Sequence, residues 1–138
     1  MPNHYHLLLF QKESGSISKA IQTTMNSYVQ GVNTEFHLSG SLFEGKAKHK
    51  LIDSDRYVVQ VVRYIHLNPV NAKLVATPEE WKHSDYVRWI HDAQNKNFNS
   101  HDWISLRNSN FRNGKNYRSF VEEYDNGTVD ISKYLFED

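Results

Sequence analysis

The sequence predicts an α+β fold, because strand-like and helix-like segments alternate from its start to Val75. Met1–Phe10 and Ser41–Ile52 have the character of strands. The segment between them and the segment that follows both carry apolar residues at helical spacing. The predicted order is therefore strand, helix, strand, helix.

Length and composition fit one domain. The chain has 138 residues, no cysteine and a formal net charge of zero. We find no signal peptide and no apolar run of membrane length, so we expect a cytoplasmic protein without a membrane partner. Without cysteine, histidine and oxygen ligands are the choices for a metal. With no net positive charge, any nucleic acid must be bound by local basic patches.

The first predicted strand contains His4 and His6. Side chains two residues apart on a strand face the same side, so the two imidazoles form a candidate donor pair for a divalent metal. The alternative is that they are two partly exposed polar residues without a ligand.

The first predicted helix lies within Ser14–Phe36. Gly15 and Ser16 precede it as a plausible N-cap, and His37–Gly40 ends it. Its apolar stripe consists of Ile17, Ile21, Met25, Tyr28 and Val32. We expect this helix to serve mainly as scaffold.

The second predicted strand carries alternating lysines, Lys46, Lys48 and Lys50. On one strand face they can contact successive phosphates of a nucleic acid. The alternative is an ordinary solvated strand face.

The second predicted helix starts near Tyr57 after a cap at Asp53 or Ser54, and Val58, Val61, Val62 and Ile65 form its buried stripe. Tyr64 and Asn68 stand four residues apart, which places them one turn above the other. Pro69 should kink or stop the helix just past Asn68. A core aromatic and a C-terminal cap are the alternative roles for Tyr64 and Asn68.

Two neighbours of Tyr64 carry further expectations. Arg63 can lower the pKa of the phenol or hold a phosphate, although a surface role is equally compatible with its place on the helix. His66 faces away from Tyr64, and we expect it to be structural or a surface residue.

The chain resembles a known family, the single-tyrosine HUH transposases, in particular the repeat-associated tyrosine transposases. The similar segments are MPNHYHLLL, GSLFEGKAKHKLID, RYIHLNPVNAKLV and WKHSDY. They match, in order, the family's histidine strand, basic strand, nucleophile helix and tryptophan-serine-tyrosine turn. The resemblance runs from Met1 to about Val87, with a looser similarity in the tail. It implies a catalytic core over residues 1–94 and a helical extension over residues 95–138 that packs on this core.

The resemblance implies cleavage and joining of single-stranded or hairpin DNA. Tyr64 would be the nucleophile that forms a 5′-phosphotyrosine intermediate, and His4, His6 and Asn68 would hold Mg²⁺ or Mn²⁺. Lys46, Lys48, Lys50 and Arg63 would contact the DNA.

The family's pattern includes a strand and a helix upstream of the histidine strand, and this sequence starts at that strand. With those elements the fold would be an antiparallel sheet with helices packed on one face, a ferredoxin-like core. Without them we expect a truncated core with an exposed strand edge, which a second copy of the chain could cover as a homodimer. The alternatives in function are a catalytically inactive DNA-hairpin-binding remnant and a metal-dependent hydrolase.

Overall fold

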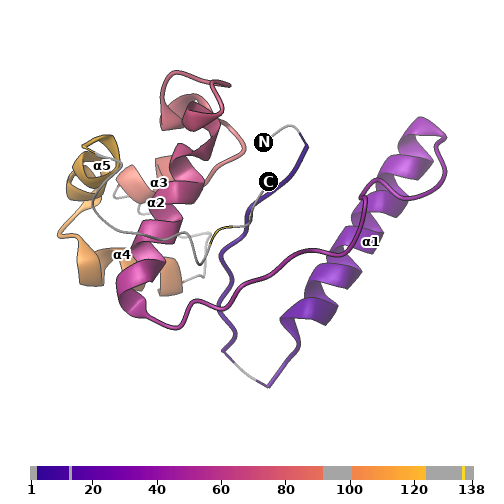
Figure 1. Cartoon of the computed structure of the whole chain (residues 1–138), viewed down its shortest axis with the longest axis horizontal. Helices are drawn as coiled ribbons and strands as arrows, with labels where there is room; N and C mark the ends of the chain where they lie inside the picture. The colour runs from indigo at the N-terminus through magenta and orange to yellow at the C-terminus, as the bar shows by residue number, and fades with distance from the viewer. Residues whose placement is uncertain (1–2, 13, 92–100, 124–134, 136–138) are drawn as a thin grey trace. The chain divides into compact units, whose positions relative to one another are not determined.

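The computed structural model describes residues 3–12, 14–91, 101–123 and 135 of the chain. Its elements are helices (Figure 1), in the order α1 (Ile17–Phe36), α2 (Asp55–Asn71), the 3₁₀ turn η1 (Pro78–Glu80), α3 (Tyr86–Ile90), α4 (His101–Asn110) and α5 (Gly114–Glu122). None of the described helices is long and apolar enough to cross a membrane.

The predicted α+β fold is wrong. The described residues contain no β-strand, so neither the antiparallel sheet nor the ferredoxin-like core is found among them. The predicted strands Met1–Phe10 and Ser41–Ile52 are irregular chain wherever they are described. A strand requires a second strand to pair with its backbone groups, and the pattern of side chains does not reveal whether such a partner is within reach.

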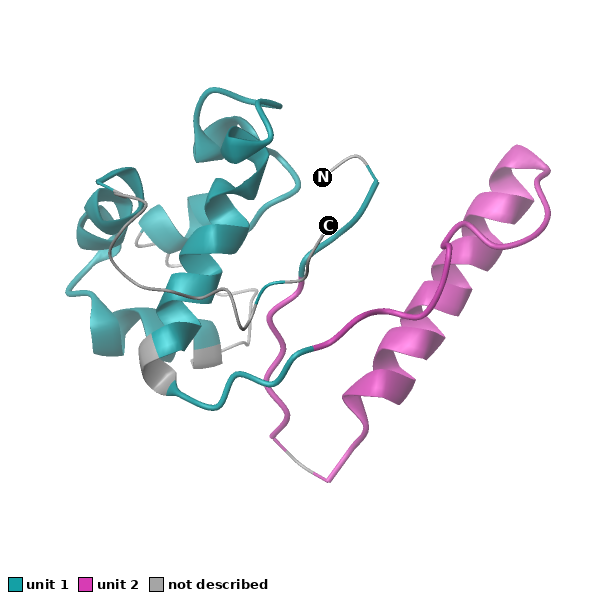
Figure 2. Cartoon of the chain, in the orientation of Figure 1, with its two compact units in different colours: residues 1–6, 50–138 teal, residues 7–49 magenta. Residues whose placement is uncertain are grey.

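The chain divides into two compact units (Figure 2), which we call the helical unit (residues 1–6 and 50–138) and the α1 unit (residues 7–49). The boundary predicted between residues 94 and 95 falls outside the described residues. The tail helices α4 and α5 contribute to the same core as α2 and α3.

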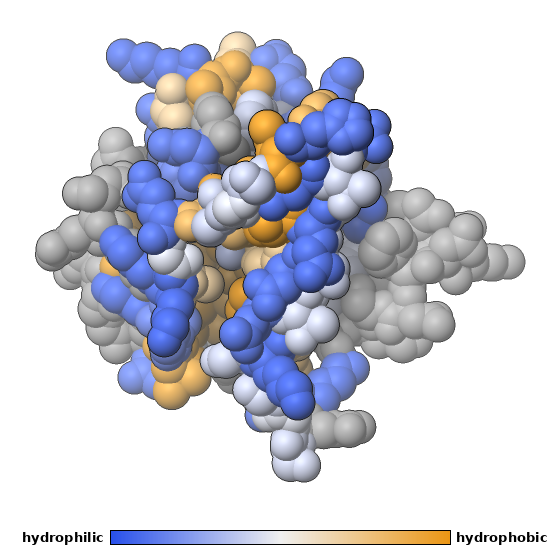
Figure 3. Space-filling view, turned by 90° about the vertical axis from the view of Figure 1, so that its right-hand side faces the viewer, coloured by the Kyte–Doolittle hydropathy of each residue, from blue (hydrophilic) through white to orange (hydrophobic). Residues whose placement is uncertain are grey.

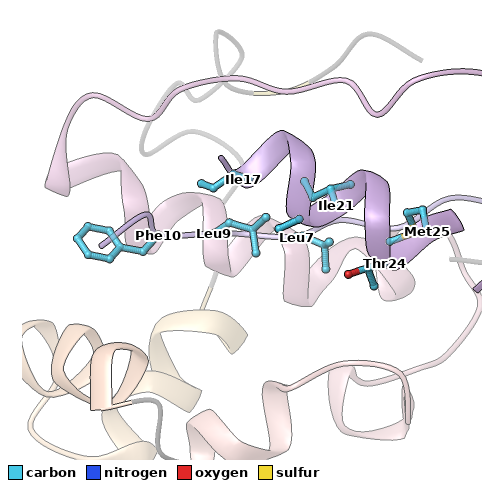
Figure 4. A pocket seen from close by; sticks show the side chains of 8 residues that line it. Leu7, Leu9, Phe10, Ile17, Ile21, Thr24 and Met25 are labelled. Atoms are coloured by element: carbon cyan, nitrogen blue, oxygen red, sulfur yellow. The ribbon is translucent and has the colours of Figure 1, made fainter. Parts of the chain in front are cut away.

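Helix α1 begins where predicted, because the Ser16 hydroxyl accepts a hydrogen bond from the Lys19 backbone N–H at 3.2 Å. Its apolar stripe and the preceding chain line a groove of about 260 Å³ (Figure 4), formed by Leu7, Leu9, Phe10, Ile17, Ala20, Ile21, Thr24 and Met25. No residue of α1 is fully buried. On the face that Figure 3 presents, hydrophobic residues lie between larger hydrophilic areas.

The core of the helical unit is aromatic. Its buried side chains are Val62, Tyr86, Trp89, Ile90, Tyr117 and Val121, with Leu67, Trp103, Leu106, Phe111 and Phe120 packed against them. The ring of Tyr117 lies 4.8 Å from that of Trp89 and 5.1 Å from that of Phe111, measured between centroids. This core is the support against which α2 is held.

Helix α2 runs through Pro69 and ends at Asn71, so the stop predicted just past Asn68 comes later than expected. Its fully buried valines are Val59, Val61 and Val62, whereas the predicted stripe members Val58 and Ile65 are half-buried. The face turned to the core is therefore rotated relative to the predicted one, and it includes His66.

Candidate functional site

The predicted metal ligands converge at one place in the helical unit. The rings of His4 and His6 lie 5.0 Å apart between centroids. The Asn68 side-chain amide donates to Nε2 of His6 at 3.3 Å. The ring of Tyr64 stands nearly perpendicular to that of His6, with their centroids 5.8 Å apart. Four residues that the sequence singled out thus form a contiguous group, although His4 and His6 are not on a strand.

The hydrogen bonds of the two histidines favour the tautomers that a metal ligand needs. Nδ1 of His4 donates to the Asn3 side-chain oxygen at 2.9 Å, which leaves the lone pair of His4 on Nε2. Nε2 of His6 accepts from Asn68, so it too carries a lone pair. A neutral imidazole with its lone pair on Nε2 is a standard metal donor, and at His6 a metal would take the place of the Asn68 N–H.

The donor set is two imidazoles and one carboxamide. The oxygen and nitrogen of an amide side chain can exchange places by a half-turn, so the position now held by Asn68 Nδ2 is also open to its oxygen. Within the described residues, no three His, Cys, Asp or Glu side chains gather closely enough to hold a metal ion. The amide of Asn68 is therefore needed to complete a three-donor set here.

The four residues of this group are partly accessible to solvent. His4 is exposed, and His6, Tyr64 and Asn68 are half-buried. Tyr64 and Asn68 lie on the face of α2 away from His66, as their spacing predicts.

Arg63 lies elsewhere. It keeps only 6% of its surface exposed, and its guanidinium sits 4.2 Å from the centre of the Phe120 ring. It donates to the Phe120 carbonyl at 3.2 Å and to the side chain of Gln60. These contacts hold the Arg63 guanidinium against α5, so the DNA contact expected of Arg63 finds no support in the structure.

The three lysines are exposed, but they do not lie on a strand. Lys46 and Lys48 belong to the α1 unit and Lys50 to the helical unit, where its ammonium donates to the carbonyl of Leu135. The DNA contacts predicted for them, like the metal and the homodimer, stay predictions.

A hydrogen-bonded chain centred on the buried His66 is not indicated by the sequence. His66 is 1% exposed, with Nε2 at 2.9 Å from the Asp85 carboxylate and Nδ1 at 2.6 Å from the Tyr117 hydroxyl. Asp85 also accepts from the indole N–H of Trp89 at 2.9 Å. His66 follows Val62 by four residues, and this spacing could have placed it on the buried face. Nothing in the sequence indicates its partners.

Electrostatics in this chain follow from burial and hydrogen bonding. Burial alone would raise the pKa of Asp85, but the hydrogen bonds from His66 and Trp89 lower it to below its ordinary value of 3.8. Burial raises the pKa of the Tyr117 phenol far above its ordinary value, so this hydroxyl stays protonated.

A comparison of the chain with protein-family models, curated proteins and solved structures finds no match.

Proposed function

We propose that the chain is a transposase-like enzyme that cleaves and rejoins single-stranded or hairpin DNA, with Tyr64 as its nucleophile and a divalent metal as its cofactor. One observation carries the proposal: His6, with His4 beside it, contacts both Tyr64 and Asn68, which lie far from the two histidines in the sequence. The family resemblance of the sequence supports the choice of substrate.

The residues present fit a metal ion. His4, His6 and Asn68 would hold it through two imidazole nitrogens and an amide oxygen, a donor set that suits Mn²⁺ better than Mg²⁺ by ligand softness. When bound, the ion supplies positive charge that polarises the scissile phosphate and stabilises the leaving oxygen.

The role of Tyr64 follows from the chemistry of a phenol. Its oxygen attacks the phosphorus, so a bond from phosphorus to tyrosine forms while the bond to the 3′-oxygen of the DNA breaks. The phenol loses its proton to solvent, and the departing 3′-oxygen takes one up as a free hydroxyl. The phosphotyrosine keeps the energy of the phosphodiester, so the same atoms can rejoin without a nucleotide cofactor.

Exposed cations provide the means to hold the DNA backbone. Lys46 and Lys48 are exposed on the segment that follows α1. Since the chain has no net positive charge, binding rests on such local groups and weakens as salt is raised.

The test is a covalent-adduct assay. Labelled hairpin DNA is incubated with the protein and Mn²⁺, denatured and resolved on a gel. We expect an adduct from the natural chain and from Tyr57→Phe, a matched control on the same helix, and no adduct from Tyr64→Phe. Omitting the metal or introducing His6→Ala should also abolish it.

Each other result contradicts the proposal in its own way. An adduct that survives Tyr64→Phe moves the nucleophile to another residue. Cleaved product without an adduct indicates a metal-dependent hydrolase. Binding without cleavage indicates a hairpin-binding remnant.

A further inference from the structure

The hydrogen-bonded chain Asp85–His66–Tyr117 runs from an exposed carboxylate to a buried phenol, and its direction is defined at the carboxylate end. An ionised carboxylate can only accept, so Nε2 of His66 carries the proton that it shares with Asp85. Nδ1 of His66 lies 2.6 Å from the Tyr117 hydroxyl, which can donate to it or accept from it. Both ring nitrogens are satisfied in one ring orientation.

These hydrogen bonds hold α2 on the side opposite to the candidate site. At about 100° per residue, Tyr64 and Asn68 lie roughly 40° apart around the helix, whereas His66 lies roughly 160° from each of them. Asp85 immediately precedes α3, and Tyr117 lies in α5, so the ring of His66 is held by two elements other than its own helix.

Apolar packing alone controls the rotation of a helix less strictly than directional hydrogen bonds do. With side chains about 5–6 Å from the axis, a rotation of 30° moves their tips by roughly 3 Å. Such a shift would break the 3.3 Å contact between Asn68 and His6. A displacement of about 1 Å at reacting groups can already cost roughly 100-fold in rate.

We infer that His66 is a positioning residue: its hydrogen bonds to Asp85 and Tyr117 fix the rotation of α2 and thereby direct Tyr64 and Asn68 toward His6. The inference rests on the proposed function for its catalytic consequence. The positioning itself concerns the geometry of the site without metal or DNA.

The core offers a matched pair of variants. Tyr117 and Tyr86 are both 0% exposed, and their rings lie 5.8 Å and 5.3 Å from that of His66. Tyr117 bonds to His66, whereas the Tyr86 hydroxyl has no hydrogen-bond partner among the described residues. Tyr117→Phe and Tyr86→Phe therefore remove the same atom from the same core, and only the first breaks the chain.

The experiment measures three quantities on the full chain. These are the ¹⁵N resonances of the His6 imidazole in metal-free protein, the dissociation constant for Mn²⁺, and the rate of adduct formation with hairpin DNA. Tyr117→Phe should shift the His6 resonances, weaken Mn²⁺ binding and slow adduct formation about 10-fold or more, with unchanged hairpin affinity. Tyr86→Phe should match the natural chain in all three.

Folding is controlled by circular dichroism and by a second variant. If Tyr117→Phe does not fold, Asp85→Asn replaces it. One oxygen of Asp85 accepts from His66 and the other from Trp89, so an amide must turn its N–H groups toward one of these donors. The side chain of Asp85 is 54% exposed, so the substitution should leave the fold intact.

Two results separate the inference from the proposed function. If the natural chain forms no adduct, the proposed function fails, and the His6 resonances still decide the positioning role. If folded Tyr117→Phe or Asp85→Asn shows the same His6 resonances and Mn²⁺ affinity as Tyr86→Phe, His66 is only a packing residue and the inference is overturned.

Discussion

Replacing Gly114 with alanine would place a methyl group where the backbone of Ile90 already lies. An ideal Cβ on Gly114 would be 2.0 Å from the Ile90 carbonyl oxygen and 2.5 Å from its carbonyl carbon. Ordinary carbon–oxygen contacts are about 3.3 Å or longer, so the overlap exceeds roughly 1 Å. Both atoms belong to the backbone of Ile90, so a change of rotamer cannot relieve the clash.

The end of α3 cannot move freely to make room. Arg107 is 6% exposed and donates to the carbonyls of Trp89 and His91, which flank Ile90. Overpacking a core costs about 1–3 kcal/mol, and replacing glycine with alanine in a helix returns at most about 1 kcal/mol. Because the clash is with backbone and strains these bonds, we expect a net loss of about 2 kcal/mol in the free energy of unfolding.

A loss of this size lowers the melting temperature by roughly 8–16 °C for a small domain. The assay is thermal unfolding followed by the fluorescence of Trp89 and Trp103, which pack in the core. Gly31→Ala is the control, because a Cβ at Gly31 meets no atom within 4 Å. A melting temperature of Gly114→Ala within about 2 °C of the control, which corresponds to less than roughly 0.5 kcal/mol for a small domain, would refute the packing of α3 against α5.

Three further predictions concern the helical unit. Burial raises the pKa of Tyr86 to about 12, so between pH 10 and pH 12 the folded chain keeps a proton that the unfolded chain loses. The free energy of unfolding, measured with urea, should therefore fall as the pH rises above 10, and it should fall less in Tyr86→Phe. The pKa of Asp85 is lowered in the folded state, so its ionised form stabilises the fold above pH 3.8, and this stabilisation is lost as the pH falls through the folded-state pKa. In acid, the free energy of unfolding should therefore fall less in Asp85→Asn than in the natural chain. Asn113 caps α5 by accepting from the Asn116 backbone N–H at 3.0 Å; Asn113→Ala should cost about 1 kcal/mol in urea unfolding, and an unchanged midpoint would contradict the cap.

The sequence predicted helices better than strands for a physical reason. The hydrogen bonds of α1 and α2 close within the helices themselves, so local periodicity was enough to find both. Sheet pairing depends on a partner that local pattern does not reveal, and the segments around His4 and Lys48 are irregular in the described residues. The buried face of α2 was misplaced by about one position because Val58, Val59, Val61 and Val62 offer equivalent apolar side chains over an arc of about 160°, wider than the stripe that is buried.

The candidate site was predictable to the extent that it depends on spacing. Tyr64 and Asn68 share a face because they lie four residues apart, and this much needs no tertiary structure. Arg63 shows the opposite case, since its adjacency to Tyr64 in sequence suggested a shared role, whereas one step of about 100° carries it into contact with Phe120. The partners of His66 come from elements beyond α2, so only the structure could identify them.

Different residues of α2 serve the fold and the proposed activity, so substitutions on this helix can change one without the other. Tyr64 and Asn68 are half-buried and lie outside the core cluster, so their substitution would remove the proposed chemistry at small cost to folding. Val62 belongs to the core, and its truncation would cost stability without altering a reacting group. His66 links the core to the candidate site, because its side chain is buried with the core and its backbone lies between Tyr64 and Asn68. The variant Tyr117→Phe therefore tests whether the core also positions the site. If it stays folded but loses the contact between Asn68 and His6, the hydrogen bond between His66 and Tyr117 orients Tyr64 and Asn68.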